Sequence, residues 1–416
     1  MNVAIIGAGA AGLAAARQCH RAGFSCQVFE QSGRVGGIWV YEPRTEDDPL
    51  GLAPTQPVFS SLYDSLRTNL PRDLMAFADY TFDSAGGGSD DDLRFPHHPA
   101  VLEYLERFTR DHDLAPNIRL NAEVSAICPD GKGWQVTTRD GETGRYDAVL
   151  VCNGHYSRPR VPHLEGIEKF QGNLLHAHNY RNKSPFAGQR VALWGTAASG
   201  ADLSREIAQV AETVYWCGHL FADIAPAVQD GITLSHPPAA FTGANTLQLE
   251  SGQTVEIDTF IYCTGYEYQF PFLPDGIISV DDNRIFPLYL DIVPPTHPTL
   301  GFIGIPYLVV PFPLFDLQAR WFTGLLKGDV ALPNAESLDV YFARRDEVDL
   351  PRHYHRLGDA QADYMAQLAA DCGAEAPPEW FHKLAKAAQE ARMVDPKGFR
   401  EKDFPAFGPT VVRSAI

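Results

Sequence analysis

Several short runs of this chain are dominated by apolar residues. Such runs are typical of strands that are buried on both faces of a parallel sheet. Segments rich in good helix formers follow two of the runs, at residues 13–18 and 203–208. The runs that we interpret as strands are residues 3–6, 148–151, 190–194, 214–217 and 260–263. The pattern therefore predicts an α/β fold.

A glycine-rich turn at residues 7–12 connects the first predicted strand to its helix. In a dinucleotide-binding unit the first glycine permits the tight turn, the second lets the backbone approach a pyrophosphate, and the third lets the helix pack on the strand. The helix N-terminus supplies N–H donors for the phosphates. Glu30 follows Gly12 by eighteen residues, where an acid accepts hydrogen bonds from a ribose. The residues expected to contact the dinucleotide are Gly7, Gly9, Ala10, Ala11, Gly12 and Glu30.

A second turn of this kind occupies residues 195–200. Its first and third glycines are present, but Ala197 stands at the middle position, which alanine can occupy if its φ is negative. The residues expected to contact a cofactor here are Gly195, Ala198, Ser199, Gly200 and Asp202. Because a glycine pattern alone is a moderate signal, an ordinary structural turn remains an alternative. Two dinucleotide sites in one chain indicate electron transfer between two cofactors.

The residues after Glu30 indicate which dinucleotide the first turn binds. Gly36-Gly37-Ile38-Trp39 resembles the extension found in FAD-binding flavoproteins that have two dinucleotide sites. Adjacent glycines let the chain pass close to the adenosine and pyrophosphate without a side-chain clash. We expect Gly37, Ile38 and Trp39 to lie at the FAD, although an ordinary core position explains Trp39 nearly as well.

Further motifs extend the resemblance over almost the whole chain. They are Phe170-x-Gly172-x-x-x-His176-x-x-x-Tyr180 and the stretches at residues 61–71, 95–96, 151–156, 262–266, 301–304 and 311–318. With these motifs the chain resembles the flavin-containing monooxygenases of the shorter, soluble kind. It is most similar to their yeast thiol-oxidising, plant glucosinolate S-oxygenating and insect alkaloid N-oxygenating branches.

The resemblance implies a reaction. The nicotinamide of NAD(P)H gives hydride to the flavin, oxygen adds to the reduced flavin as a C4a-hydroperoxide, and the distal oxygen passes to a nucleophilic sulfur or nitrogen. The expected partners are O2 and a small thioether, thiol or amine. Ketone-oxygenating Baeyer–Villiger relatives usually have Trp where this chain has Tyr180, which favours heteroatom oxygenation. A Baeyer–Villiger oxygenase and an uncoupled NAD(P)H oxidase remain alternatives.

The resemblance also implies site residues. Asn69 is the expected catalytic residue, because the matching asparagine of the family lies beside the flavin C4a position. A turn-forming asparagine is the alternative interpretation. The other expected cofactor contacts are Arg67, Thr68, Leu70, His176, Thr264, Gly265 and Gln318. For His176, a structural histidine is at least as good an interpretation.

One departure from the family concerns the nicotinamide cofactor. Many relatives have an arginine after the strand at residues 214–217, which pairs with the 2′-phosphate of NADPH. This chain has Gly218 and His219 there, with no Arg or Lys nearby. His219 is a weaker phosphate ligand than a bidentate guanidinium. We therefore expect NADPH with relaxed preference, so that NADH is also used.

Composition limits the remaining possibilities. The net charge of −18 argues against partners such as nucleic acid or an anionic membrane surface. Seven cysteines without a CxxC pair or metal-ligand spacing predict no metal site and a cytoplasmic location. The longest apolar stretch, residues 300–315, contains three prolines and is too short to span a bilayer.

The motifs also predict the domain organisation. We expect two dinucleotide-binding, Rossmann-like domains, with the smaller NADP domain inserted into the FAD domain. Residues 1–160 and 271–416 form the expected FAD-binding domain, and residues 161–270 form the expected NAD(P)H-binding domain. Relatives are often dimers, so a homodimer is expected too.

Overall fold

A computed structural model describes residues 1–83, 93–223, 227–346, 351–402 and 404. The chain divides into two compact units. The first unit comprises Met1–Val40, Arg67–His155 and Tyr268–Ile416, and the second comprises Tyr41–Leu66 and Tyr156–Glu267. Each unit contains its own parallel sheet, and each is described by itself below.

The first unit is built on a five-stranded sheet in which every neighbouring pair is parallel. Its strands, in spatial order, are β19 (Leu300–Phe302), β7 (Ala148–Val151), β1 (Asn2–Ile6), β2 (Ser25–Phe29) and β3 (Ile118–Arg119). The sequence explains this placement, because β1 and β7 consist almost wholly of apolar residues and are buried.

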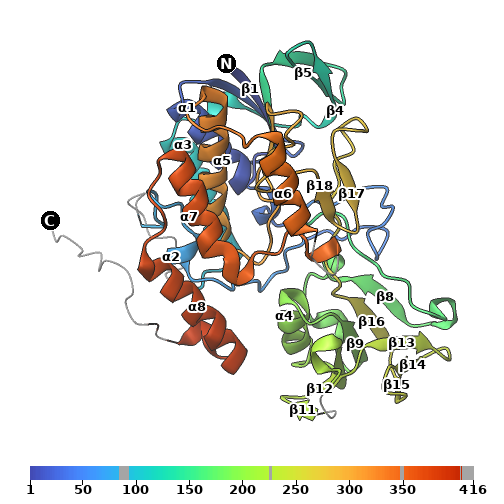
Figure 1. Cartoon of the computed structure of the whole chain (residues 1–416). Helices are drawn as coiled ribbons and strands as arrows, with labels where there is room; N and C mark the ends of the chain where they lie inside the picture. Colours follow the sequence, from blue (N-terminus) through green and yellow to red (C-terminus); the bar gives the residue numbers. More distant parts are fainter. Residues whose placement is uncertain (84–92, 224–226, 347–350, 403, 405–416) are drawn as a thin grey trace. The chain divides into compact units, whose positions relative to one another are not determined.

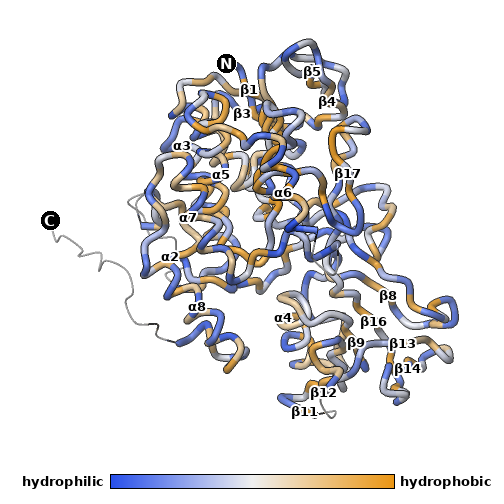
Figure 2. The backbone as a smooth tube through the Cα atoms, viewed as in Figure 1, coloured by the Kyte–Doolittle hydropathy of each residue, from blue (hydrophilic) through white to orange (hydrophobic). Residues whose placement is uncertain are grey.

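The first unit also contains helices. They are α1 (Ala10–Arg21), α2 (Arg72–Met75), α3 (His98–Asp111), α5 (Pro311–Lys327), α6 (Ala335–Arg345), α7 (Gln361–Cys372) and α8 (Glu379–Val394). Helices α1, α5 and α7 lie side by side, with α5 in contact with both of the others (Figure 1). Hydrophobic and hydrophilic residues alternate along α7 and α8 (Figure 2), and the buried ones, such as Met365 and Phe381, join the core.

Two small antiparallel sheets complete the first unit. They consist of β4 (Val124–Asp130), β5 (Gly133–Thr138) and β6 (Thr143–Tyr146), and of β17 (Ser279–Asp281) and β18 (Arg284–Phe286). Trp134 of β5 is buried and donates from its indole N–H to the Thr299 hydroxyl at 3.0 Å.

The second unit contains a six-stranded sheet. Its strands, in spatial order, are β11 (Ala227–Gln229), β12 (Ile232–Ser235), β10 (Thr213–Cys217), β9 (Arg190–Trp194), β16 (Thr259–Tyr262) and β8 (Asn173–His176). Every pair is parallel except β11 with β12. Helix α4 (Ala198–Ile207) packs on β9 and β10, and a separate sheet consists of β13 (Pro238–Phe241), β14 (Thr246–Leu249) and β15 (Thr254–Glu256).

The Tyr41–Leu66 segment is grouped differently from the domain limits expected from the sequence, which placed residues 1–160 together in the FAD domain. It belongs to the second unit, where buried polar side chains hold it. Arg181 donates from Nε to the Glu42 carbonyl at 2.7 Å, and Asn179 Oδ1 accepts from Glu46 N at 2.9 Å. The other limits of the second unit, Tyr156 and Glu267, lie close to the expected 161 and 270.

The structure confirms the predicted strands and helices of both dinucleotide units. The five apolar runs are β1, β7, β9, β10 and β16, within one residue at each end. The predicted helix at residues 13–18 lies within α1, and the one at residues 203–208 ends one residue beyond α4. Among the described residues, none of the helices combines the length and the hydropathy that a membrane crossing needs.

Candidate functional site

The first glycine-rich turn has the close backbone packing that the motif requires. Gly7 has φ +103° and its N–H donates to the Phe29 carbonyl at 2.7 Å. A Cβ at Gly12 would overlap the carbonyl oxygen of Gly7, so the first turn of α1 sits directly against β1. Only glycine fits at these two positions.

The Gly36-Gly37 pair lies against this turn. Gly36 N donates to the Ala8 carbonyl at 2.9 Å, and a Cβ on Gly37 would lie 2.9 Å from the Cα of Gly9. Helix α1 begins with Gly9 as N-cap, and no side chain caps it. The turn therefore leaves backbone N–H groups at a helix N-terminus, which is the donor set that a pyrophosphate requires. These residues fit FAD.

Glu30 lies at the end of β2 and is buried. Its Oε2 accepts from Ala8 N at 2.8 Å, and its Oε1 accepts from Ser32 N at 2.8 Å. Each carboxylate oxygen has a second lone pair, so Glu30 can hold the turn in place and still accept from a ribose hydroxyl. The contact of Glu30 with a ribose stays a prediction.

Asn69 lies in a segment that is fixed on both sides. Arg67 Nε donates to the Phe95 carbonyl at 3.0 Å and its guanidinium pairs with Glu401, while Thr68 Oγ1 donates to the Leu70 carbonyl at 2.8 Å. Arg400 Nε donates to the Thr68 carbonyl at 3.0 Å. Arg67, Thr68 and Leu70 thus support the segment.

The side chain of Asn69 itself makes no hydrogen bond within the described part of the chain. Its φ is not positive either, because Asn69 is absent from the residues with left-handed backbone. A turn-forming asparagine would show a local hydrogen bond or a positive φ. The described structure therefore gives no support to the turn-forming interpretation of Asn69.

Two further expected contacts in the first unit have a different environment. Gln318 on α5 is completely buried, accepting from Gly304 N at 3.0 Å and donating to Tyr364 Oη at 2.8 Å. Both ends of the amide thus hold protein groups in place, and the expected cofactor contact of Gln318 stays a prediction. Trp39, in the 3₁₀ turn Gly37–Trp39 with Ile38, is half-buried and packs edge-on against Phe312 of α5.

The second turn reproduces the geometry of the first. Gly195 has φ +132° and its N–H donates to the Cys217 carbonyl at 2.9 Å. A Cβ on Gly200 would overlap the carbonyl oxygen of Gly195. Ala197 is the N-cap of α4 with φ −80°, so the condition set for alanine at this position is confirmed. No side chain caps α4, and its first N–H groups, with Ala198 and Ser199, fit a second pyrophosphate.

The remaining residues expected at the nicotinamide site lie at the ends of strands in the second unit. His219 is exposed, one residue after Gly218. After β16, Thr264 Oγ1 donates to the Arg160 carbonyl at 2.5 Å, and Gly265 has φ +83° and open space beside its Cα. Asp202 on α4 accepts from Tyr63 Oη at 3.0 Å, a contact that the sequence analysis did not foresee.

His176 is completely buried at the end of β8, and its expected cofactor contact stays a prediction. Its Nδ1 accepts from His178 N at 3.1 Å. Burial, and then the neighbouring His178, lowers the pKa of His176 to about 3. The imidazole is therefore neutral and a poor base, so the structural interpretation of this histidine is the better one.

The second unit contains a row of interacting polar side chains that the sequence analysis did not predict. Ser61 Oγ donates to the Tyr156 carbonyl and lies 2.8 Å from His178 Nδ1, while His178 Nε2 lies 3.4 Å from Glu46 Oε1. Burial raises the pKa of Glu46, but His178 and the Val58 N–H outweigh it, so the net pKa is lowered. This chain of contacts anchors the Tyr41–Leu66 segment within the second unit.

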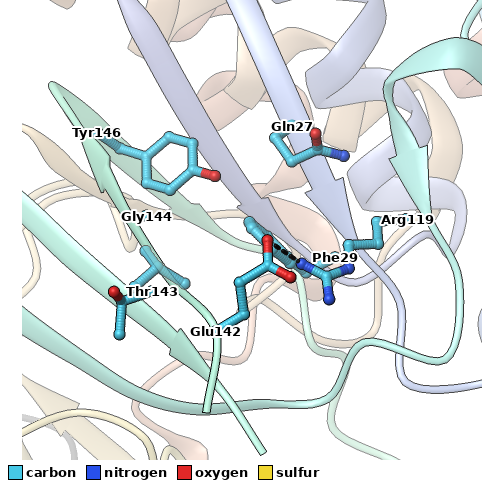
Figure 3. Close-up of a pocket in the computed structure, with 8 residues that line it drawn as sticks. Gln27, Phe29, Arg119, Glu142, Thr143, Gly144 and Tyr146 are labelled. Carbon is cyan, nitrogen blue, oxygen red and sulfur yellow. Dashed lines mark ion pairs between the residues drawn. The ribbon is translucent and has the colours of Figure 1, made fainter. Parts of the chain in front are cut away.

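A surface hollow in the first unit is separate from these residues. It lies between β2, β3 and the β5–β6 hairpin (Figure 3), where Arg119 and Glu142 form an ion pair of 2.6 Å across it. Its lining residues include none of the residues expected at a cofactor.

Comparison with known proteins agrees with this geometry. The chain matches the family described as flavin-binding monooxygenase-like at residues 1–225 and 226–381. It is 40% identical to flavin-containing monooxygenase FMO GS-OX5 of Arabidopsis thaliana, over 97% of this chain and 91% of that protein.

The similarity to solved structures agrees with this family assignment. S-allyl-L-cysteine S-oxygenase of Allium sativum superposes with a TM-score of 0.92 at 39% identity, covering 96% of this chain and 95% of that one. Tmm of Pelagibacter sp. strain HTCC7211 superposes with a TM-score of 0.83 at 25% identity, covering 97% and 94%. The two nucleotide units, the motifs and these likenesses together show that the chain belongs to the flavin-binding monooxygenase-like family, as a flavoprotein that uses FAD and NADPH.

Proposed function

We propose that this enzyme oxygenates the sulfur atom of a small thioether. In the balanced reaction, the thioether, O2, NADPH and one proton give the sulfoxide, NADP+ and water. The observation that carries the preference for sulfur is the likeness to S-allyl-L-cysteine S-oxygenase, which extends over 96% of this chain at 39% identity. The similarity to the GS-OX monooxygenases of Arabidopsis thaliana points the same way.

The residues of the chain have binding and orienting roles in this proposal. The N-termini of α1 and α4 bind the two pyrophosphates, and Glu30 binds a ribose hydroxyl of FAD. Bound FAD supplies the redox and oxygen-activating chemistry. Asn69 provides the amide that orients groups at the reacting centre, because its hydrogen-bonding groups have no partner within the described residues.

The test is a competition between sulfur and nitrogen. Purified FAD-loaded enzyme is given NADPH, 18O2, S-allyl-L-cysteine and a tertiary amine of similar size, with catalase present to remove free peroxide. We expect sulfoxide carrying one 18O atom, close to one sulfoxide per NADPH consumed, and less N-oxide. Faster N-oxide formation would overturn the choice of sulfur.

Two other outcomes would overturn more of the proposal. Efficient conversion of a cyclic ketone to a lactone would make the enzyme a Baeyer–Villiger oxygenase. NADPH consumption with peroxide as the sole product would make it an oxidase.

A cytoplasmic location and a homodimer are also part of the proposal. All seven cysteines are free thiols, five of them buried, which suits a reducing compartment. Light scattering on the purified protein tests the oligomeric state, and fractionation of its source cells tests the location.

A further inference from the structure

The carboxyl ends of β10 and β12 bring two histidines onto neighbouring segments. The strands are parallel neighbours in which Cys217 faces Ser235. Just beyond that pair, Gly218 N donates to the Ser235 carbonyl at 3.1 Å. His236 follows Ser235 directly, and His219 follows Gly218. Both side chains are at least partly exposed, and neither makes a hydrogen bond within the described residues.

This edge is where the fold places the ribose of a bound dinucleotide. Gly218 follows Gly200 by eighteen residues, the same spacing that separates Glu30 from Gly12 in the first unit. In such units an acid at this point binds the ribose hydroxyls of NADH, or an arginine binds the 2′-phosphate of NADPH. Here the equivalent of Glu30 is a glycine, which offers no side chain for either purpose.

The packing explains the glycine. A Cβ on Gly218 would lie 2.6 Å from Cγ2 of Thr196 in the phosphate-binding turn. The strand end therefore lies directly beside that turn, and an arginine at position 218 would displace Thr196. A cationic or donor group for the 2′-phosphate has to come from the residues that follow.

The nearby segments contain no lysine or arginine. Residues 218–223 and 236–245 include none. Elsewhere in the second unit, Arg190 pairs with Asp258 at 2.7 Å, and Arg205 donates to the Ala201 carbonyl and stacks over Trp216. Within residues 218–223 and 236–241, the side chains that carry an N–H donor are those of His219 and His236.

We propose that His219 and His236 together bind the 2′-phosphate of NADPH. Each imidazole donates one N–H to a phosphate oxygen, in place of the paired N–H groups of a guanidinium. Two separate single donors hold a phosphate less firmly than one bidentate arginine. The enzyme therefore binds NADPH more tightly than NADH by a modest factor.

Direct binding tests the proposal without turnover. Isothermal titration of FAD-loaded protein with NADP+ and with NAD+ is carried out on the wild type and on His219→Gln, His236→Gln and the double variant. Each single change removes one hydrogen bond to a charged group, so the NADP+ affinity falls about tenfold, while the NAD+ affinity stays within about twofold. His382→Gln, on α8 of the first unit, is the matched control and leaves both affinities unchanged.

Equal losses for the two nucleotides, or an unchanged NADP+ affinity in the double variant, would overturn the proposal. A second experiment introduces an arginine at the strand end, where this chain has none. Gly218→Arg combined with Thr196→Ser places a guanidinium at the strand end and removes the methyl group that its Cβ would meet. We expect tighter NADP+ binding with unchanged NAD+ binding, and a much smaller effect of His219→Gln in this background. An unchanged NADP+ affinity in this correctly folded variant would show that the phosphate lies elsewhere.

Discussion

Ala197 and Gly9 have nearly the same backbone conformation, although they are different residues in the turns of different units. Ala197 has φ −80° and ψ −166°, and Gly9 has φ −77° and ψ −174°. Each is the N-cap of the helix that follows its turn. The backbone conformation at the middle position of the motif therefore does not require glycine.

This equivalence predicts the effect of two substitutions in the second turn. Ala197→Gly should change the NADP+ dissociation constant by less than about twofold, because alanine already has an allowed φ. Gly200→Ala should abolish NADP+ binding, because its Cβ would overlap the Gly195 carbonyl oxygen. Titration calorimetry on FAD-loaded protein measures both, and tight binding by the Gly200 variant would contradict the geometry.

Asn69→Ala should separate catalysis from folding. Because the side chain makes no hydrogen bond in the described structure, Tm and FAD content should not change. Loss of an orienting donor should lower sulfoxide formation about 10²-fold. Asn182 is the control, since its Oδ1 accepts from Ser184 N at 3.0 Å in a turn. Asn182→Ala should lower Tm while the enzyme still forms close to one sulfoxide per NADPH consumed. If both variants lowered Tm and neither lowered sulfoxide formation, Asn69 would be a turn former.

Gln318→Leu should act on stability. It leaves the Gly304 N–H without its acceptor and removes the donor to Tyr364, which costs about 1–3 kcal/mol for a buried group. The free energy of unfolding from urea titration should fall by that amount, while turnover per bound FAD is retained. Retained stability with lost FAD would instead indicate a direct cofactor contact.

Asp291 should make the first unit sensitive to acid. Burial raises the pKa of this carboxyl, but Arg345 at 2.6 Å and His355 at 2.9 Å outweigh it and hold the pKa at about 2. The unfolded value is about 3.9, so the ionised pair stabilises the fold above about pH 4. That contribution, about 2–3 kcal/mol, is lost as the pH falls towards 2.

The comparison with Asp291→Asn isolates this effect from other carboxylates. The difference in unfolding free energy between wild type and variant should be largest at pH 7 and shrink between pH 4 and pH 2. A difference that is constant over this range would show that Asp291 is not ionised in the folded protein.

Local signals explain why both turns could be predicted. Each turn depends on a few neighbouring residues, and close backbone packing explains its glycines. A Cβ on Gly12, for example, would overlap the carbonyl oxygen of Gly7. Helix α5 was harder to recognise because it begins with Pro311 and contains Pro313. Prolines are tolerated in a first helical turn, where the N–H groups have no partner anyway.

The environment of single side chains could not be predicted in the same way. His176 and Gln318 belong to family motifs, yet both are completely buried, and burial depends on elements far away in the sequence. The place of the Tyr41–Leu66 segment depends on Asn179 and Arg181, more than 130 positions further along. No periodicity within the segment indicates that partner.

The second unit is formed by two separate stretches of the chain, so a single continuous fragment cannot contain all of it without other residues. A fragment of residues 156–267 would keep the whole six-stranded sheet but lack the Tyr41–Leu66 segment. Buried Arg181 would then lose the Glu42 and Arg44 carbonyls, and Glu46 would no longer face His178. A stable excised nicotinamide module should therefore require both stretches fused through a linker, with residues 41–66 supplied at one end of residues 156–267.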